Sequence, residues 1–182
     1  MTHPIAIPYF SGHGHTARLA QAIAEGAAPA RLIDIETMTQ ADWDALDAAP
    51  AIIFGSPTYM GSVAARYVHF LEEASDARWT AQSWQNKLAG GFTIGTYPSG
   101  DKLSTLLRLS IFAAQMGMLW VGATEIGAPV NPDRPGIDRD GSMLGLMARS
   151  DPDKSRLISD GDAETARLFG TRLRRAADRW GR

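Results

Sequence analysis

Cysteine is absent from the 182-residue chain. Its absence excludes disulfide bonds, thiolate metal sites and dithiol redox chemistry, so a redox function would require a bound cofactor. A long apolar run and a signal-peptide pattern are absent too, and the first expected strand begins already at Ile5. We therefore expect a cytoplasmic protein with no segment inserted in a membrane.

A charge excess of either sign is also lacking. The chain has 18 basic and 20 acidic side chains, for a net charge of -2, which gives no electrostatic reason to expect a nucleic acid or an anionic membrane as partner. His13 and His15 lie two residues apart with no third ligand near them in the sequence, so we expect no metal site. The length and the apolar content of 45% fit one globular domain over residues 1–182.

Short apolar runs and amphipathic stretches alternate along the chain. The runs are almost continuous rather than alternating, which is typical of strands buried on both faces of a parallel sheet. They cover residues 5–10, 32–35, 51–55, 88–94 and 118–121. Helical patterns cover about residues 19–27, 40–47, 63–71, 103–114 and 163–179. The alternation predicts an α/β three-layer sandwich with a five-stranded parallel sheet of order 2-1-3-4-5.

Two features interrupt this pattern. Pro8 falls inside the expected central strand and has no N–H group, so we expect a bulge or a missing hydrogen bond there. Residues 128–158 form a long, turn-rich segment between the fifth strand and the last helix. Segments of this length in compact domains are usually functional or mobile, so we expect a loop insertion.

The turn after the first strand, "SGHGHT" at residues 11–16, is the first candidate ligand site. It should lie at the carboxyl edge of the sheet and at a helix N-terminus, where an anion is favoured. A triphosphate loop is excluded because its lysine is missing. Residues 12–17 match the weak pattern G-x-G-x-x-A of a dinucleotide loop, with Asp34 in the place of a ribose-binding acid.

A phosphate monoester is the other ligand that this turn could hold. Its three oxygen atoms favour hydroxyl donors, which Ser11 and Thr16 supply, and His13 and His15 could add ring N–H groups. The simplest alternative is that Ser11 only caps the helix and that Gly14 only turns the chain.

Two further turns follow the third and fourth expected strands, "GSPTYMG" and "TIGTYPSGD". A flavin ring needs backbone polar groups along one edge and an apolar or aromatic neighbour on its face. Each turn alone would more commonly be a solvent loop. Because all these turns should meet at one sheet edge, we predict a flavin site that includes Pro57, Thr58, Tyr59, Met60, Gly61, Ile94, Gly95, Thr96, Tyr97, Pro98 and Ser99.

Four longer stretches of the sequence occur in a characteristic order and spacing: "SGHGHTARLAQAIAEG", "GSPTYMGSVAARYVHFLE", "WTAQSWQNKLAGGFTIGT" and "QMGMLWVGA". In these stretches the sequence resembles the WrbA-type NAD(P)H:quinone oxidoreductases. The resemblance implies a flavodoxin-like fold, FMN as cofactor, NADH or NADPH as co-substrate and a small-molecule quinone as acceptor. The phosphate of FMN would then be held by Ser11, Gly12, His13, Gly14, His15 and Thr16.

The resemblance also implies a homodimer or homotetramer. In that family a neighbouring subunit contributes a tryptophan to the quinone pocket, at the position of Trp79, and the nicotinamide is held near the position of His13. We take His13 and Trp79 as the candidate catalytic residues. Two departures concern the substrate: the third turn has few glycines, and Gln115 or Met116 replaces a family histidine.

Three alternatives remain open. The chain could be a flavodoxin that only carries electrons, a dehydrogenase that uses nicotinamide without flavin, or a scaffold of the same fold without cofactor. Electron carriers are usually strongly acidic around the flavin, which a net charge of -2 does not match.

Overall fold

The computed structural model describes residues 3–153 and 155–181. Its strands are β1 (Ile5–Tyr9), β2 (Ala30–Asp34), β3 (Ala51–Tyr59), β4 (Ser62–Val63), β5 (Leu88–Gly95), β6 (Leu119–Trp120) and β7 (Leu146–Arg149). Its helices are α1 (His15–Gly26), α2 (Gln40–Ala48), α3 (Ala65–Arg78), α4 (Lys102–Gln115) and α5 (Asp160–Trp180). The main sheet is parallel in the order β2-β1-β3-β5-β6, which confirms the expected flavodoxin-like α/β fold.

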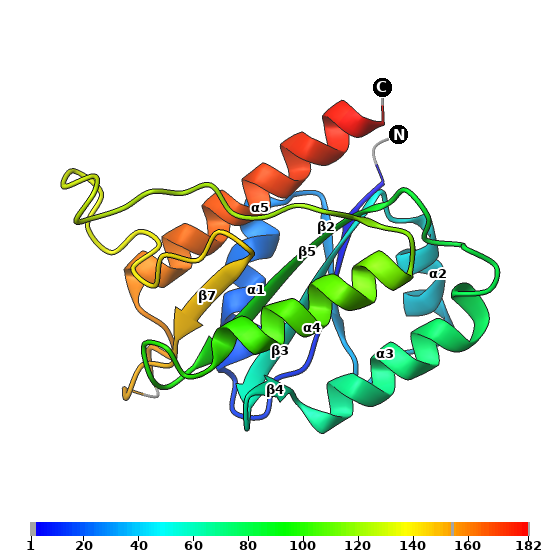
Figure 1. Cartoon of the computed structure of the whole chain (residues 1–182), viewed down its shortest axis with the longest axis horizontal. Helices are drawn as coiled ribbons and strands as arrows, with labels where there is room; N and C mark the ends of the chain where they lie inside the picture. The colour runs from blue at the N-terminus through cyan, green and yellow to red at the C-terminus, as the bar shows by residue number, and fades with distance from the viewer. Residues whose placement is uncertain (1–2, 154, 182) are drawn as a thin grey trace.

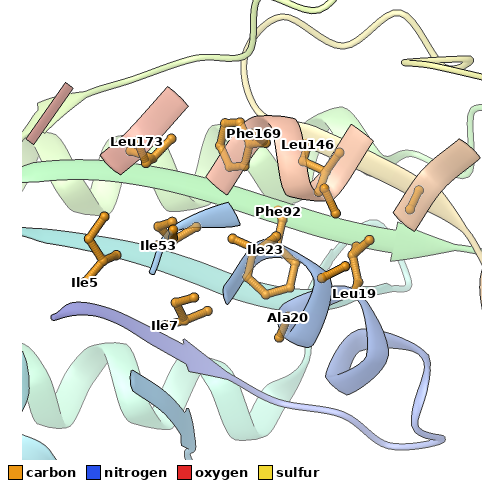
Figure 2. Close-up of a cluster of buried hydrophobic side chains, with 14 of the residues drawn as sticks. Ile5, Ile7, Leu19, Ala20, Ile23, Ile53, Phe92, Leu146, Phe169 and Leu173 are labelled. Carbon is orange, nitrogen blue, oxygen red and sulfur yellow. The ribbon is translucent and has the colours of Figure 1, made fainter. Parts of the chain in front are cut away.

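Helices cover both faces of the sheet (Figure 1). On one face, side chains of β1, β3 and β5 pack against α1 and α5, as Figure 2 shows for Phe92 beside Ile23 and Ile53. On the other face, Ile52 and Phe54 pack against α2, α3 and α4. The first seven residues of β3 are buried without interruption, which explains why the strand sequences do not alternate.

The fifth position of the sheet is occupied by two separate strands. β6 pairs with the start of β5 at Leu88–Leu119, and β7 pairs with its end, from Phe92–Leu146 to Gly95–Arg149. Between them residues 121–145, here called the excursion, leave the sheet and return to it (Figure 1). The predicted loop at 128–158 therefore contains a strand. Four residues within a turn-rich region gave no signal of strand length.

The pairing of β1 with β3 is interrupted at the proline, as expected. The two strands pair at Ala6–Ile52 and Tyr9–Gly55, and the described strand has no partner on β3 at the two positions between. The hydroxyl of Tyr67, from α3, donates to the Pro8 carbonyl oxygen at 2.8 Å and accepts the Gly55 N–H at 3.0 Å. A buried side chain thus supports the backbone where the ladder is incomplete.

Replacing Tyr67 by Phe should destabilise the fold by about 1–3 kcal/mol, because two buried backbone groups lose a partner. Burial raises the pKa of Tyr67 well above its ordinary value. The Tyr67 hydroxyl therefore loses its proton at a lower pH in the unfolded chain than in the folded protein. As a result, the stability that Tyr67 contributes should fall as the pH rises above about 10. Denaturant titrations at neutral and alkaline pH measure both effects. Tyr97→Phe, at an exposed site, is the control, and equal unfolding free energies for the two variants would contradict this role.

Candidate flavin site

The three predicted turns meet at the carboxyl edge of the sheet around a pocket of about 190 Å³. The pocket is lined by Gly12, His13, His15, Thr16, Pro57, Thr58, Tyr59, Ile94, Gly95, Thr96 and Ser150. All of these residues except Ser150 are among those predicted from the sequence. The structure therefore brings them together, while their role in binding stays a prediction.

The first turn combines a helix cap with a possible anion site. The Ser11 Oγ accepts the Ala17 N–H at 3.1 Å, so Ser11 satisfies one of the free N–H groups of α1 from outside the helix, whose N-cap residue is Gly14. A hydroxyl that accepts one hydrogen bond still has its own proton to donate, so capping and phosphate binding are compatible. Thr16 is buried, and the first helical turn of α1 contains no acidic residue that would repel an anion.

Glycine is required twice in this turn. Gly14 has φ +87, a left-handed conformation that favours glycine. A Cβ atom at Gly12 would lie 2.6 Å from the Tyr59 hydroxyl oxygen, so the absence of a side chain lets the Tyr59 ring lie against the first turn. The first and second turns thereby form one continuous wall of the pocket.

A cluster of three threonine hydroxyl groups holds the second turn in place at Thr58. The Thr58 Oγ1 lies 2.8 Å from Thr93 Oγ1 and 2.8 Å from Thr105 Oγ1. These two hydrogen bonds link β3 to β5 and to α4. Beyond Thr58 the chain forms a tight hairpin in which Met60 and Gly61 both have positive φ. Met60 is fully exposed at the hairpin tip and does not line the pocket.

The third turn is only partly in the pocket. Ile94, Gly95 and Thr96 line it, whereas Tyr97 is 74% exposed. Pro98 and Ser99 line a different pocket, on the side of α4 that faces Arg139 and Arg149. Of the aromatic residues expected to cover a flavin ring, Tyr59 is at the pocket and Tyr97 is outside it.

Trp79 lies away from this pocket within the chain. It is 55% exposed and lines a separate groove, whose other residues are Leu71, Glu72, Ser75, Arg108, Phe112, Gln115 and Met116. Asp34, the acid of the dinucleotide alternative, is also absent from the lining of the flavin pocket, and its carboxylate accepts the Glu36 N–H at 3.1 Å. The pocket therefore gives the dinucleotide alternative no support.

Ser150 was missed because it follows β7, which was not predicted. Its Oγ donates to the Thr96 Oγ1 at 3.3 Å. If β7 had been predicted, Ser150 could have been found as well, because a polar residue directly after a strand at the carboxyl edge is a candidate ligand contact.

Comparison with known proteins identifies the family. The model of the family described as NADPH-dependent FMN reductase matches residues 36–131, and the flavodoxin FldP of Pseudomonas aeruginosa is 40% identical, over 93% of this chain and 94% of that one. The chain belongs to the flavodoxin-like family of FMN-binding oxidoreductases.

Other members of this flavodoxin-like family agree with the assignment. An NAD(P)H dehydrogenase (quinone) of Geobacter sulfurreducens is 31% identical, over 91% of this chain and 93% of that one. The crystal structure of a WrbA-like flavodoxin from Agrobacterium tumefaciens superposes with a TM-score of 0.78 at 39% identity, covering 98% of this chain and 99% of that one. The family thus includes proteins named as electron carriers and proteins named as enzymes.

Within residues 3–153 and 155–181, no group of three His, Asp or Glu side chains is arranged to hold a metal ion. The helices in those ranges are all too short or too polar to cross a membrane.

Proposed function

We propose that the protein is an FMN-dependent oxidoreductase that takes electrons from NADH or NADPH and passes them to a quinone or a similar small acceptor. The observation that carries the proposal is the meeting of the three turns in one pocket, beside a helix N-terminus with hydroxyl side chains and no acidic residue in its first turn. The names of several relatives, NAD(P)H dehydrogenase (quinone), support the activity.

Different residues at the pocket would hold the phosphate and the ring of FMN. Ser11, Thr16 and the start of α1 would hold the phosphate, since charge-assisted hydrogen bonds and the helix dipole favour a dianion there. The ring would lie between the second and third turns, with Tyr59 beside it. When bound, FMN would supply the two-electron transfer chemistry. The protein would orient the ring and leave one side open to the nicotinamide donor. His13, which lines the pocket and is exposed, would contact that donor.

An electron carrier without turnover of its own is the second candidate. It is favoured by one observation, the 40% identity to a protein named flavodoxin. The net charge of -2 argues against the carrier, because electron carriers are usually strongly acidic around the flavin.

Assembly into a homodimer or homotetramer is part of the proposal. The groove of Trp79 shares no lining residue with the flavin pocket, so Trp79 would reach a flavin only in a second copy. On α4, Leu103, Leu107 and Ile111 are exposed at a spacing of four residues and form an apolar stripe. Such a stripe is suited to a subunit interface.

Replacing both Ser11 and Thr16 by Ala should weaken FMN binding by about tenfold or more, since each charge-assisted hydrogen bond contributes about 1.5–3 kcal/mol. Fluorescence titration of the apoprotein measures the effect. Riboflavin has no phosphate and serves as the control ligand, so its affinity should change much less. Equal losses for both flavins would show that the two hydroxyls do not bind the phosphate.

The FMN-loaded protein should oxidise NADH or NADPH with a soluble quinone and give parallel lines in a two-substrate initial-rate study, because donor and acceptor would use one flavin face in turn. Intersecting lines would refute that scheme. Absence of turnover with either nicotinamide, in protein that holds FMN, would favour the electron carrier.

Replacing Trp79 by Ala should lower kcat/KM for the quinone several-fold, by about 1 kcal/mol or more for the loss of a buried aromatic contact at an interface, with little change in FMN affinity. Light scattering should give the mass of a dimer or tetramer. A mass near 19.6 kDa at micromolar concentration would contradict a shared pocket.

A further inference from the structure

A buried ion cluster lies directly behind the third turn. The side chain of Lys102, the first residue of α4, is 0% exposed, and its ammonium group pairs with the carboxylate of Asp140, which is 2% exposed. The same ammonium donates to the Ala148 carbonyl oxygen at 3.1 Å. The second oxygen of Asp140 accepts the Arg149 Nε–H at 2.6 Å. Because an unpaired buried charge is strongly destabilising, these groups have to stay together.

The cluster joins parts of the chain that are far apart in sequence. Lys102 follows the third turn, Asp140 belongs to the excursion, and Arg149 ends β7. The Arg149 N–H and the Arg139 guanidinium both bond to Asp162 at the start of α5, at 3.3 Å and 2.5 Å. The end of the excursion and β7 are therefore fixed between α4, α5 and the edge of β5 (Figure 1).

This arrangement brings Ser150, the residue that follows β7, to the flavin pocket. The Ser150 N–H donates to the Gly95 carbonyl oxygen at 3.0 Å, which extends the pairing of β7 with β5 by one residue. Behind Gly95 lies the stem of Lys102, whose Cγ would be 3.4 Å from a Cβ added to Gly95. The Ser150 hydroxyl consequently reaches the pocket, where it bonds to Thr96.

Leu157, further along the chain than Ser150, lies beside the first turn. The Leu157 side chain lies 3.6 Å from the position that a Cβ of Gly14 would take. Ser150 and Leu157 are thus placed between the turn expected to hold the phosphate and the turn expected to hold the ring. In FMN that interval is bridged by the ribityl chain, whose hydroxyl groups suit a serine and a threonine hydroxyl as partners.

We propose that Ser150 and Leu157, which follow β7, form a fourth wall of the flavin site, in which Ser150 binds the ribityl chain and Lys102 and Asp140 are positioning residues. The inference rests on the proposed binding of FMN. According to this proposal the excursion is more than a surface loop, because it leads the chain back to the pocket.

Ser150→Ala tests the contact. It should weaken both FMN and riboflavin by about three- to tenfold, the value of one hydrogen bond, because both ligands contain the ribityl chain. Thr16→Ala should instead weaken FMN more than riboflavin. Ser110→Ala, at an α4 serine that lines none of the pockets described above, should change neither. If the wild-type protein binds FMN and Ser150→Ala binds both flavins as tightly, the fourth wall is refuted. If the wild-type protein binds no FMN, the proposed function fails with it.

The paired variant Lys102→Met with Asp140→Asn tests the positioning role, because it removes both buried charges together. It should weaken FMN binding by about tenfold and shift the absorbance bands of the bound flavin, because the hydrogen bonds that hold Ala148 and Arg149 behind the third turn are lost. The matched control is Glu125→Gln with Arg134→Gln, which breaks an ion pair in the excursion away from the pocket and should leave affinity and spectrum unchanged. Wild-type affinity and spectrum in the folded test variant would overturn the positioning role. Should that variant fail to fold, Arg149→Gln takes its place, because it weakens only the pairing of Asp140 with Arg149, and wild-type affinity and spectrum in that variant would overturn the positioning role.

Discussion

The burial of the sheet on both faces is the constraint on which the remaining structure depends. α1 and α5 close one face, and α2, α3 and α4 close the other. A strand in such a sheet can present side chains to a ligand only where it ends. The polar and glycine-containing turns are therefore concentrated at the carboxyl edge, while the buried central strands are mainly apolar. The same constraint places a helix N-terminus beside the pocket without any further adaptation.

The charge of Lys102 is the second requirement that shapes the site. A fully buried ammonium group needs a carboxylate and further acceptors, and here they come from the excursion and from β7. The cost of separating these groups ties a segment far along the chain to the third turn. Despite its prolines and glycines, the excursion is thereby held at its end behind the third turn, through Asp140.

Much of the fold could be predicted because its signals are local. Strand-length apolar runs such as residues 51–55, and the helical pattern of residues 103–114, follow from burial on both faces and from amphipathic periodicity. The first turn could be located because an apolar run, a glycine-containing turn and a helix follow one another directly. Even the disturbance at Pro8 was predictable, since proline has no N–H group.

The rest depends on contacts that no local pattern contains. β7 has four residues and is stabilised by pairing with β5 and by the burial of Leu146. Without β7, Ser150 could not be assigned to the pocket and the ion cluster could not be placed behind the third turn. The outward position of Tyr97 follows from the path of a turn in which Gly100 and Asp101 both have positive φ. Trp79 could contact a flavin only in a second subunit, and the position of a second subunit cannot be predicted from the sequence of one chain.

The central claim is that the pocket at the carboxyl edge holds FMN. The most direct measurement is the absorbance spectrum of the protein after addition of FMN and removal of the excess by gel filtration, followed by identification of the flavin released on denaturation. We predict a bound flavin spectrum and FMN as the released compound. A folded protein that retains no flavin after this treatment would contradict the account.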